Sequence, residues 1–177
     1  AWKWICERMN KTATVGKTTG ELTHFLIEPF TPHKDNEEFY AAIRSYRDYD
    51  TIYFSTKGGI YVEENWDKVK ETQVPTLSSA HDVKLNLPDL GKRREAVERF
   101  LRALHKFYAE SGFTYLEINP FTFSGDEIVP LDLVAKVDST AGFECEKIWG
   151  DMEFPASFGA KHTREEEFIA SLDEKSG

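Results

Sequence analysis

Residues 113–137, FTYLEINPFTFSGDEIVPLDLVAKV, are the stretch that decides the fold. Apolar, aromatic and β-branched residues dominate Phe113–Phe123 and Glu127–Val137, and the three residues between these runs are typical of a turn. The stretch therefore predicts two antiparallel strands joined by a hairpin. If Gly125 and Asp126 are the two central residues of that turn, the pairing of every other residue in the hairpin follows from it.

The predicted register places an amide and a carboxylate opposite each other. Asn119 would face Asp132, and Cβ atoms of directly opposed residues lie roughly 4.5 to 5.5 Å apart. Both side chains offer hard oxygen donors, which Mg²⁺ accepts together with water and nucleotide phosphates. Glu117, two residues before Asn119, would add negative charge on the same face. The alternative is an ordinary polar sheet face, and a three-residue loop would send the two side chains to opposite faces.

Four further strands are predicted on the amino-terminal side of the hairpin. Alternation along residues 37–47 predicts one buried face and one face that is wet or lined by a ligand. Gly58-Gly59 indicates a turn into the last of the four, and Lys57-Gly58-Gly59 is interpreted as that turn rather than as a phosphate loop. The predicted strands cover residues 23–30, 37–47, 50–56 and 60–63.

One long helix is predicted over Lys92–Ala109, where apolar residues recur at three- and four-residue spacing. Shorter helices are predicted within residues 1–10 and 164–174, and residues 64–91 are predicted to be a long connection with short helical turns. The predicted fold class is therefore α+β, a mostly antiparallel sheet with packed helices.

Composition and charge exclude several classes of protein. The 177 residues are 40% hydrophobic, which excludes a disordered chain. A net charge of -9 argues against nucleic acid or an anionic membrane surface as the main partner. Cys6 and Cys145 are too few for a disulfide scaffold or a tetrahedral zinc site, and no apolar run approaches the roughly 18 residues of a membrane span. A cytoplasmic protein is expected.

Other motifs carry weaker signals. Gly16-Lys17-Thr18 resembles the end of a phosphate-binding P-loop, but the first glycine of that motif is missing because position 11 is Lys. The five histidines show no metal-ligand spacing. An extended linker over Pro29–Pro32 would expose backbone groups that can bind an adenine edge, and Glu38 could accept hydrogen bonds from ribose hydroxyls or simply be a solvated strand residue.

Five motifs spread over nearly the whole chain form a recognisable set. They are FLIEPFTPHKDNEEFY, GGIYVEENWDKVK, FTYLEINPF, PLDLVAKVD and WGDMEFPASFG. With these motifs the chain resembles the later part of the ATP-grasp region of the ATP-citrate lyase family, which is related to succinyl-CoA ligase β subunits. The LEINP, LD and GGI elements are typical of the whole ligase superfamily, whereas EPFTPH, ENWDKVK and WGDMEFP are typical of the citrate enzymes.

The resemblance implies a role for each candidate site residue. Pro29 and Thr31 would lie on the hinge that contacts adenine, and Glu38 would lie by the ribose. Asn119 and Asp132 would hold Mg²⁺ on the nucleotide phosphates. The resemblance also implies that Glu117 lies near a loop that carries a phosphorylated histidine.

The resemblance also implies a division of the chain and a parent reaction. Residues 1–22 would be a helical lead-in, residues 23–138 the carboxy-terminal subdomain of an ATP-grasp domain, and residues 139–177 a connector toward a citrate and CoA-ligase domain. The parent reaction would be cleavage of citrate to acetyl-CoA and oxaloacetate, with ATP and CoA as substrates and Mg²⁺ as cofactor.

The triphosphate-gripping segment and the phosphorylated histidine of the family have no counterpart here, so the chain alone is expected to be inactive. It would need the other ATP-grasp half and a CoA-ligase domain or subunit, in an oligomer. A succinyl-CoA or citryl-CoA synthetase subunit and a non-catalytic subunit-interaction module are the alternative hypotheses, and the choice between ATP and GTP stays open.

Overall fold

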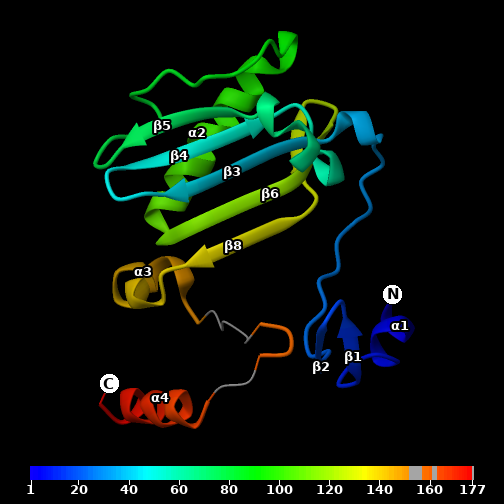
Figure 1. The fold of residues 1–177 in the computed structure, drawn as a ribbon, viewed down its shortest axis with the longest axis vertical. Helices are drawn as coiled ribbons and strands as arrows, with labels where there is room; N and C mark the ends of the chain where they lie inside the picture. The colour runs from blue at the N-terminus through cyan, green and yellow to red at the C-terminus, as the bar shows by residue number, and fades with distance from the viewer. Residues whose placement is uncertain (152–156, 161–162, 177) are drawn as a thin grey trace. The chain divides into compact units, whose positions relative to one another are not determined.

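The computed structural model describes residues 1–151, 157–160 and 163–176, and these form two compact units (Figure 1). One unit comprises Ala1–Pro29 and Asp151–Gly177, and the other comprises Phe30–Gly150. The predicted three-part division, at residues 22/23 and 138/139, is a division by function and stays a prediction. None of the helices in the described ranges has the length and apolar character needed to span a bilayer.

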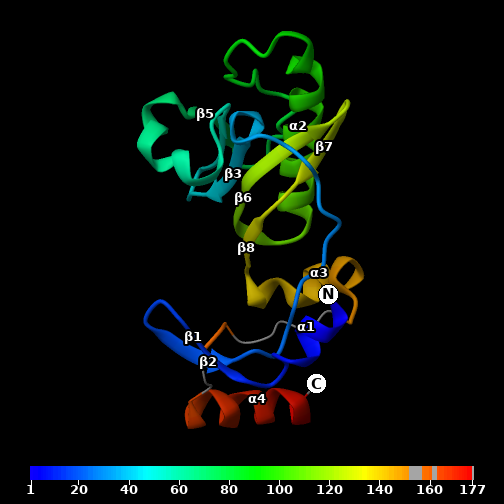
Figure 2. The same cartoon turned by 90° about the vertical axis from the view of Figure 1, so that its right-hand side faces the viewer.

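The larger unit is built on an antiparallel sheet, as the sequence predicts. Its strand order is β5-β4-β3-β6-β7, and β8 also pairs with β6 (Figures 1 and 2). The long strand β6 therefore pairs with β3, β7 and β8. The strands are β3 (Phe39–Ser45), β4 (Tyr49–Ser55), β5 (Lys70–Pro75), β6 (Phe113–Ser124), β7 (Glu127–Pro130) and β8 (Leu133–Val137).

Helix α2 (Arg94–Glu110) covers one face of this sheet (Figure 2), which confirms the prediction from its apolar spacing. Its buried residues Val97, Leu101 and Tyr108 join the same core as Ile43 of β3 and Phe121 of β6. Because aromatic and aliphatic side chains from both layers pack closely, the central strands are held rigidly in register. The packed core thus fixes the positions of the strands that carry side chains on the other face of the sheet.

The second face of the sheet carries short 3₁₀ turns, η2 (Gly59–Tyr61) and η3 (Glu63–Lys68). Val62, between the two turns, packs on Tyr40 and Ala42 of β3. The predicted strand over residues 60–63 is therefore wrong. The face of β3 that was predicted to be wet or lined by a ligand is mixed, because the 3₁₀ segment buries Tyr40 and Ala42 there while Arg44 is exposed.

Residues 23–30, predicted as a strand, form no regular element. Leu26 is 87% exposed and Phe30 is 86% exposed, so the apolar run is not packed as a strand would be. Pro29 removes one backbone donor from the run and Pro32 removes another just after it, which disfavours pairing in a sheet. The remaining short elements of the larger unit are η1 (Asp35–Glu37), η4 (Gly91–Arg93), η5 (Ser139–Ala141) and α3 (Gly142–Trp149).

The smaller unit begins with a short helix, α1 (Trp2–Cys6), as predicted. A hairpin of β1 (Thr12–Val15) and β2 (Thr18–Glu21) follows, which was not among the predicted elements. Gly16, at φ +61, lies in its turn, so the Gly16-Lys17-Thr18 motif belongs to a plain hairpin. The unit ends with α4 (Arg164–Ser176), at the position predicted for a short charged helix.

Candidate functional site

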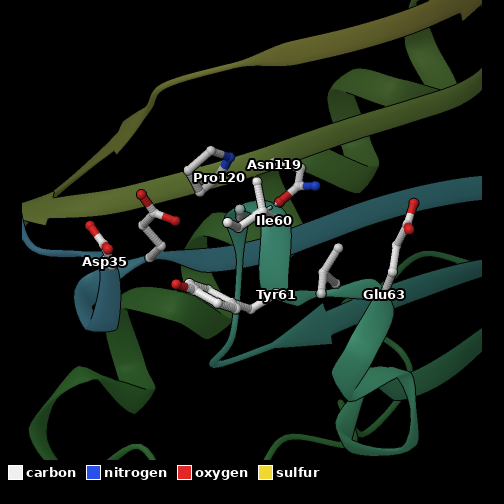
Figure 3. Close-up of a pocket in the computed structure, with 9 residues that line it drawn as sticks. Asp35, Ile60, Tyr61, Glu63, Asn119 and Pro120 are labelled. Carbon is white, nitrogen blue, oxygen red and sulfur yellow. Dashed lines mark hydrogen bonds between the residues drawn. The ribbon is translucent and has the colours of Figure 1, made fainter.

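A cavity of about 650 Å³ lies on the face of the sheet that carries η2 and η3 (Figure 3). Figure 3 shows Ile60 beside Asn119 and Pro120 of β6, with Tyr61 pointing toward the side where Asp35 lies. The volume is within the range of small-ligand sites. The lining residues are Asp35, Glu38, Gly59, Ile60, Tyr61, Val62, Glu63, Asn119 and Pro120.

The charge of this lining restricts what can bind there. Among the described lining residues three are Asp or Glu and none is Lys or Arg. An anionic ligand therefore needs a cation bound with it, or basic groups supplied from elsewhere, because carboxylates repel it. Apolar surface from Ile60, Val62 and Pro120 suits the flat face of a base or another apolar group.

Glu38, predicted to lie by a ribose, is in the cavity wall and is held from two sides. Its Oε1 lies 3.1 Å from Nε2 of His33, and the two side chains are only 17% and 19% exposed. On the other side Gly59, at φ +63, comes so close that a Cβ there would overlap Oε2 of Glu38. The carboxylate is therefore fixed in place before any ligand arrives.

His33 connects Glu38 to Thr31, the residue predicted on the adenine hinge. Nδ1 of His33 lies 2.8 Å from the carbonyl oxygen of Thr31, so both ring nitrogens face hydrogen-bond acceptors. The Thr31 carbonyl raises the pKa of His33 above its ordinary value, and the Glu38 and Asp35 carboxylates act in the same direction. Pro29, the other predicted hinge residue, belongs to the smaller unit, so its role stays a prediction.

The Gly58-Gly59 segment hydrogen-bonds to residues on two sides of the cavity, Glu38 and Asn119. Gly58 N–H donates to the carbonyl oxygen of Glu38 at 3.0 Å, and Gly59 N–H donates to Oδ1 of Asn119 at 2.7 Å. A Cβ on Gly58 would lie 2.5 Å from the carbonyl oxygen of Phe39, so the backbone itself fills that space. The two glycines thus do more than the simple turn that the sequence predicts. A side chain at Gly58 would overlap the backbone, whereas one at Gly59 would require the Glu38 side chain to move.

The hairpin register is confirmed by the pairs on both sides of the predicted metal site. Ser124 pairs with Glu127, and Ile118 pairs with Leu133. Asn119 N–H donates to the carbonyl oxygen of Asp132 at 3.2 Å, so these two residues are opposed as predicted. The second strand is broken into β7 and β8 at Leu131 and Asp132, opposite a cis Asn119–Pro120 peptide.

Both residues of this pair carry oxygen donors of the kind that Mg²⁺ accepts, and their role as a metal site stays a prediction. Oδ1 of Asn119 accepts one hydrogen bond from Gly59, and an amide oxygen retains a second lone pair. Asp132 is exposed and lies outside the cavity lining, and within the described ranges no hydrogen bond or ion pair engages its carboxylate. Those ranges hold no group of three or more His, Cys, Asp or Glu side chains that could enclose a metal by themselves.

Glu117, predicted near a phosphohistidine loop, lies on β6 and accepts two phenolic hydrogen bonds at one oxygen. Tyr115 O–H donates to Oε2 at 2.6 Å, and Tyr40 O–H donates to the same atom at 3.1 Å. Burial, followed by the hydrogen bond to Glu117, raises the pKa of Tyr115 to about 12. Burial and the Glu117 charge also raise the pKa of Tyr40. Glu117 is not part of the cavity lining.

His33, Tyr61 and the two tyrosines around Glu117 were not among the predicted site residues. His33 lacks metal-ligand spacing, but it precedes Glu38 by five residues, and the η1 turn between them brings the two side chains together. The signal that could have indicated this contact is a histidine directly after Pro32 that is followed by turn-forming residues and a glutamate. The alternation along residues 37–47 placed the Tyr40 side chain on the face predicted to be wet or lined by a ligand, but it did not identify Glu117 as the partner of Tyr40.

Comparison with known proteins places the chain in one family. The family model described as ATP-citrate synthase ATP-grasp domain matches residues 1–149. ATP-citrate synthases of Bos taurus and Homo sapiens are each 43% identical over 98% of this chain, which covers 16% of their length. The ATP-citrate synthase alpha chain protein 2 of Arabidopsis thaliana is 41% identical over 97% of this chain, which covers 41% of it.

A solved structure agrees with these sequence matches. ATP citrate lyase from Methanothrix soehngenii, determined in complex with citrate and coenzyme A, has a TM-score of 0.83 and 43% identity, over 99% of this chain and 42% of that one. The chain thus spans less than half of each of these relatives. Its α+β fold, with an antiparallel sheet and packed helices, is the fold of the matching region. The chain belongs to the ATP-citrate synthase ATP-grasp domain family.

Proposed function

We propose that this chain is the nucleotide-binding part of an ATP-citrate lyase, and that Mg-ATP binds in the cavity between η2 and β6. The single observation that carries this proposal is the convergence of Glu38 and Asn119 on one cavity through the Gly58-Gly59 segment. These two residues are distant in sequence and meet because β3 and β6 are neighbours in the sheet. Glu38 accepts hydrogen bonds from the ribose, and Thr31 and Pro29 contact the adenine.

The acidic lining favours a nucleotide that arrives with its own cation. Asn119 and Asp132 supply the two protein oxygens for Mg²⁺, and phosphates and water complete its coordination. When bound, Mg²⁺ offsets the charge of the phosphates for transfer of the terminal phosphoryl group. The chain's own residues bind and orient the nucleotide, and we assign to Glu117 the contact with a phosphorylated histidine loop from another part of the protein.

The whole protein then cleaves citrate with ATP and CoA to give acetyl-CoA, oxaloacetate, ADP and phosphate. Citrate and coenzyme A are bound in the Methanothrix soehngenii relative, and we assign both to parts of the protein beyond this chain. Separate alpha chains in Arabidopsis thaliana support an assembly of more than one subunit or domain. A cytoplasmic location is part of the same proposal.

Calorimetric titration of the complete protein with Mg-ADP tests the nucleotide assignment. Asn119→Ala and Asp132→Ala should each weaken binding by about ten-fold or more, because each removes a ligand of a charged group. Asp126→Ala is the matched control, since it removes the same charge from the exposed turn of the same hairpin. Equal affinity in the wild type and all these variants would count against the proposal and favour a subunit-interaction module.

The acid substrate is tested separately by following oxaloacetate release with ATP and CoA present. Release with citrate supports the lyase. Formation of an acyl-CoA from succinate, or of citryl-CoA without oxaloacetate, would instead support one of the two synthetases.

A further inference from the structure

His33 has a position in the fold that its sequence context alone does not explain. It lies between the extended segment that contains Thr31 and the start of β3, and the 3₁₀ turn η1 reverses the chain between them. This turn is closed by Glu37, whose Oε2 accepts the N–H of Lys34 at 3.0 Å. Thr122 of β6 donates to the carbonyl oxygen of Glu37 at 3.0 Å, which anchors the turn to the sheet.

The two ring nitrogens of His33 bond to two different parts of the proposed nucleotide site. Nδ1 faces the Thr31 carbonyl at 2.8 Å, and Nε2 faces the Glu38 carboxylate at 3.1 Å. Only the doubly protonated ring donates to both acceptors at once. Since the neighbouring acceptors raise the pKa of His33, the cationic form persists to higher pH than in a free imidazole.

Glu38 has one oxygen bound to His33 and the other against Gly59, which lines the cavity. A glutamate side chain on a strand end rotates freely unless its neighbours restrict it, and here both oxygens are restricted. A carboxylate held in this way can accept hydrogen bonds from vicinal hydroxyls without first being ordered, and that improves both affinity and discrimination.

We infer that His33 is a positioning residue that holds the Glu38 carboxylate toward the cavity and fixes it relative to the Thr31 backbone, so that the site distinguishes ribose from deoxyribose. This inference rests on the proposed function, because it takes Glu38 as the ribose contact. His33 itself does not touch the nucleotide.

Two substitutions separate the two hydrogen bonds of His33. The amide nitrogen of Asn can replace Nδ1 and keep the bond to Thr31, whereas the longer Gln can replace Nε2 and keep the bond to Glu38. His33→Asn should therefore lose the hold on Glu38, and His33→Gln should retain it. Glu38→Gln is the reference for a site without the carboxylate.

The measurement is the ratio of KM for 2′-deoxy-ATP to KM for ATP in the complete protein, with thermal midpoints as a folding control. We expect His33→Asn to lower this ratio about ten-fold, toward the value of Glu38→Gln, and His33→Gln to stay near the wild type. A purely structural role would change both KM values together and leave the ratio unaltered.

Two outcomes would overturn the inference, and they are distinguishable. If Glu38→Gln loses discrimination while His33→Asn keeps it in full, Glu38 binds the ribose but His33 does not position it. If Glu38→Gln discriminates as the wild type does, Glu38 is not the ribose contact. That result refutes this part of the proposed function, and the inference fails with it.

Discussion

Replacing Gly59 by Ala tests how the site is built, because this glycine restrains the Glu38 carboxylate. The residue has φ +63, and a Cβ there would overlap Oε2 of Glu38. Since that oxygen is the end of a flexible side chain, the carboxylate should rotate away rather than distort the sheet. The bond from Glu38 to His33 is already 3.1 Å long, so a small displacement breaks it.

The effect on stability and the effect on binding are expected to differ in size. An alanine in the left-handed region costs about 1–2 kcal/mol of unfolding free energy. Loss of the His33–Glu38 pair should add at most about 1 kcal/mol, as for other partly exposed ion pairs. Loss of the proposed ribose hydrogen bonds to a displaced carboxylate should weaken nucleotide binding by about 1.5–3 kcal/mol, which is at least ten-fold.

Gly125→Ala is the matched control, because Gly125 has φ +64 and a Cβ added there would meet no other atom within 4 Å. Urea denaturation should show similar losses of unfolding free energy for the two variants. Calorimetric titration with Mg-ADP should show weaker binding for Gly59→Ala only. If both variants bind the nucleotide equally well, Glu38 does not depend on the space at Gly59, and the reasoning is refuted.

Three other variants probe the core and two titrating groups. Leu101→Ala should lower the unfolding free energy by about 2–5 kcal/mol in urea denaturation, because Leu101 is fully buried, whereas the half-exposed Leu133→Ala should cost far less. The folded-state pKa of Tyr115 is about 12, above the unfolded value of 10, so its contribution is present below pH 10 and is lost as the pH rises toward 12. Tyr115→Phe should therefore show a smaller fall in stability over that window, and an identical fall would contradict the assignment. His33 also has a raised pKa, so the stability difference between wild type and His33→Asn should be largest below pH 6.5 and shrink at higher pH. A difference that grows with pH would have the wrong sign.

The hairpin could be predicted because its determinants are local. Gly125 and Asp126 set a two-residue turn, and that turn fixed the opposition of Asn119 and Asp132. The break between β7 and β8 did not disturb the register, since it falls beside Pro130 at a point where the chain leaves the ladder for only two residues. Helix α2 was equally predictable from its spacing.

The wall of the cavity opposite β6 could not be predicted, because its conformation is set by distant residues. Residues 60–63 have the composition of a strand, but the N–H of Gly59 bonds to Asn119, sixty positions further along the chain. Val62 then packs on Tyr40 instead of entering a ladder. His33 was not predicted for a similar reason. Its contact with Glu38 depends on the conformation of η1, which residue spacing does not indicate.

The Gly58-Gly59 segment makes the two halves of the proposed site depend on each other. Its N–H groups bond to the Glu38 backbone and to the Asn119 side chain, so a change at Asn119 is transmitted to the position of Glu38. Asn119→Ala therefore removes both a proposed metal ligand and the anchor of Gly59, whereas Asp132→Ala removes only a proposed metal ligand. Binding of ADP in the presence of EDTA should consequently be weakened by Asn119→Ala and unaffected by Asp132→Ala. If EDTA is present and both variants still lose ADP affinity to the same extent, Asp132 acts through the fold and not through Mg²⁺.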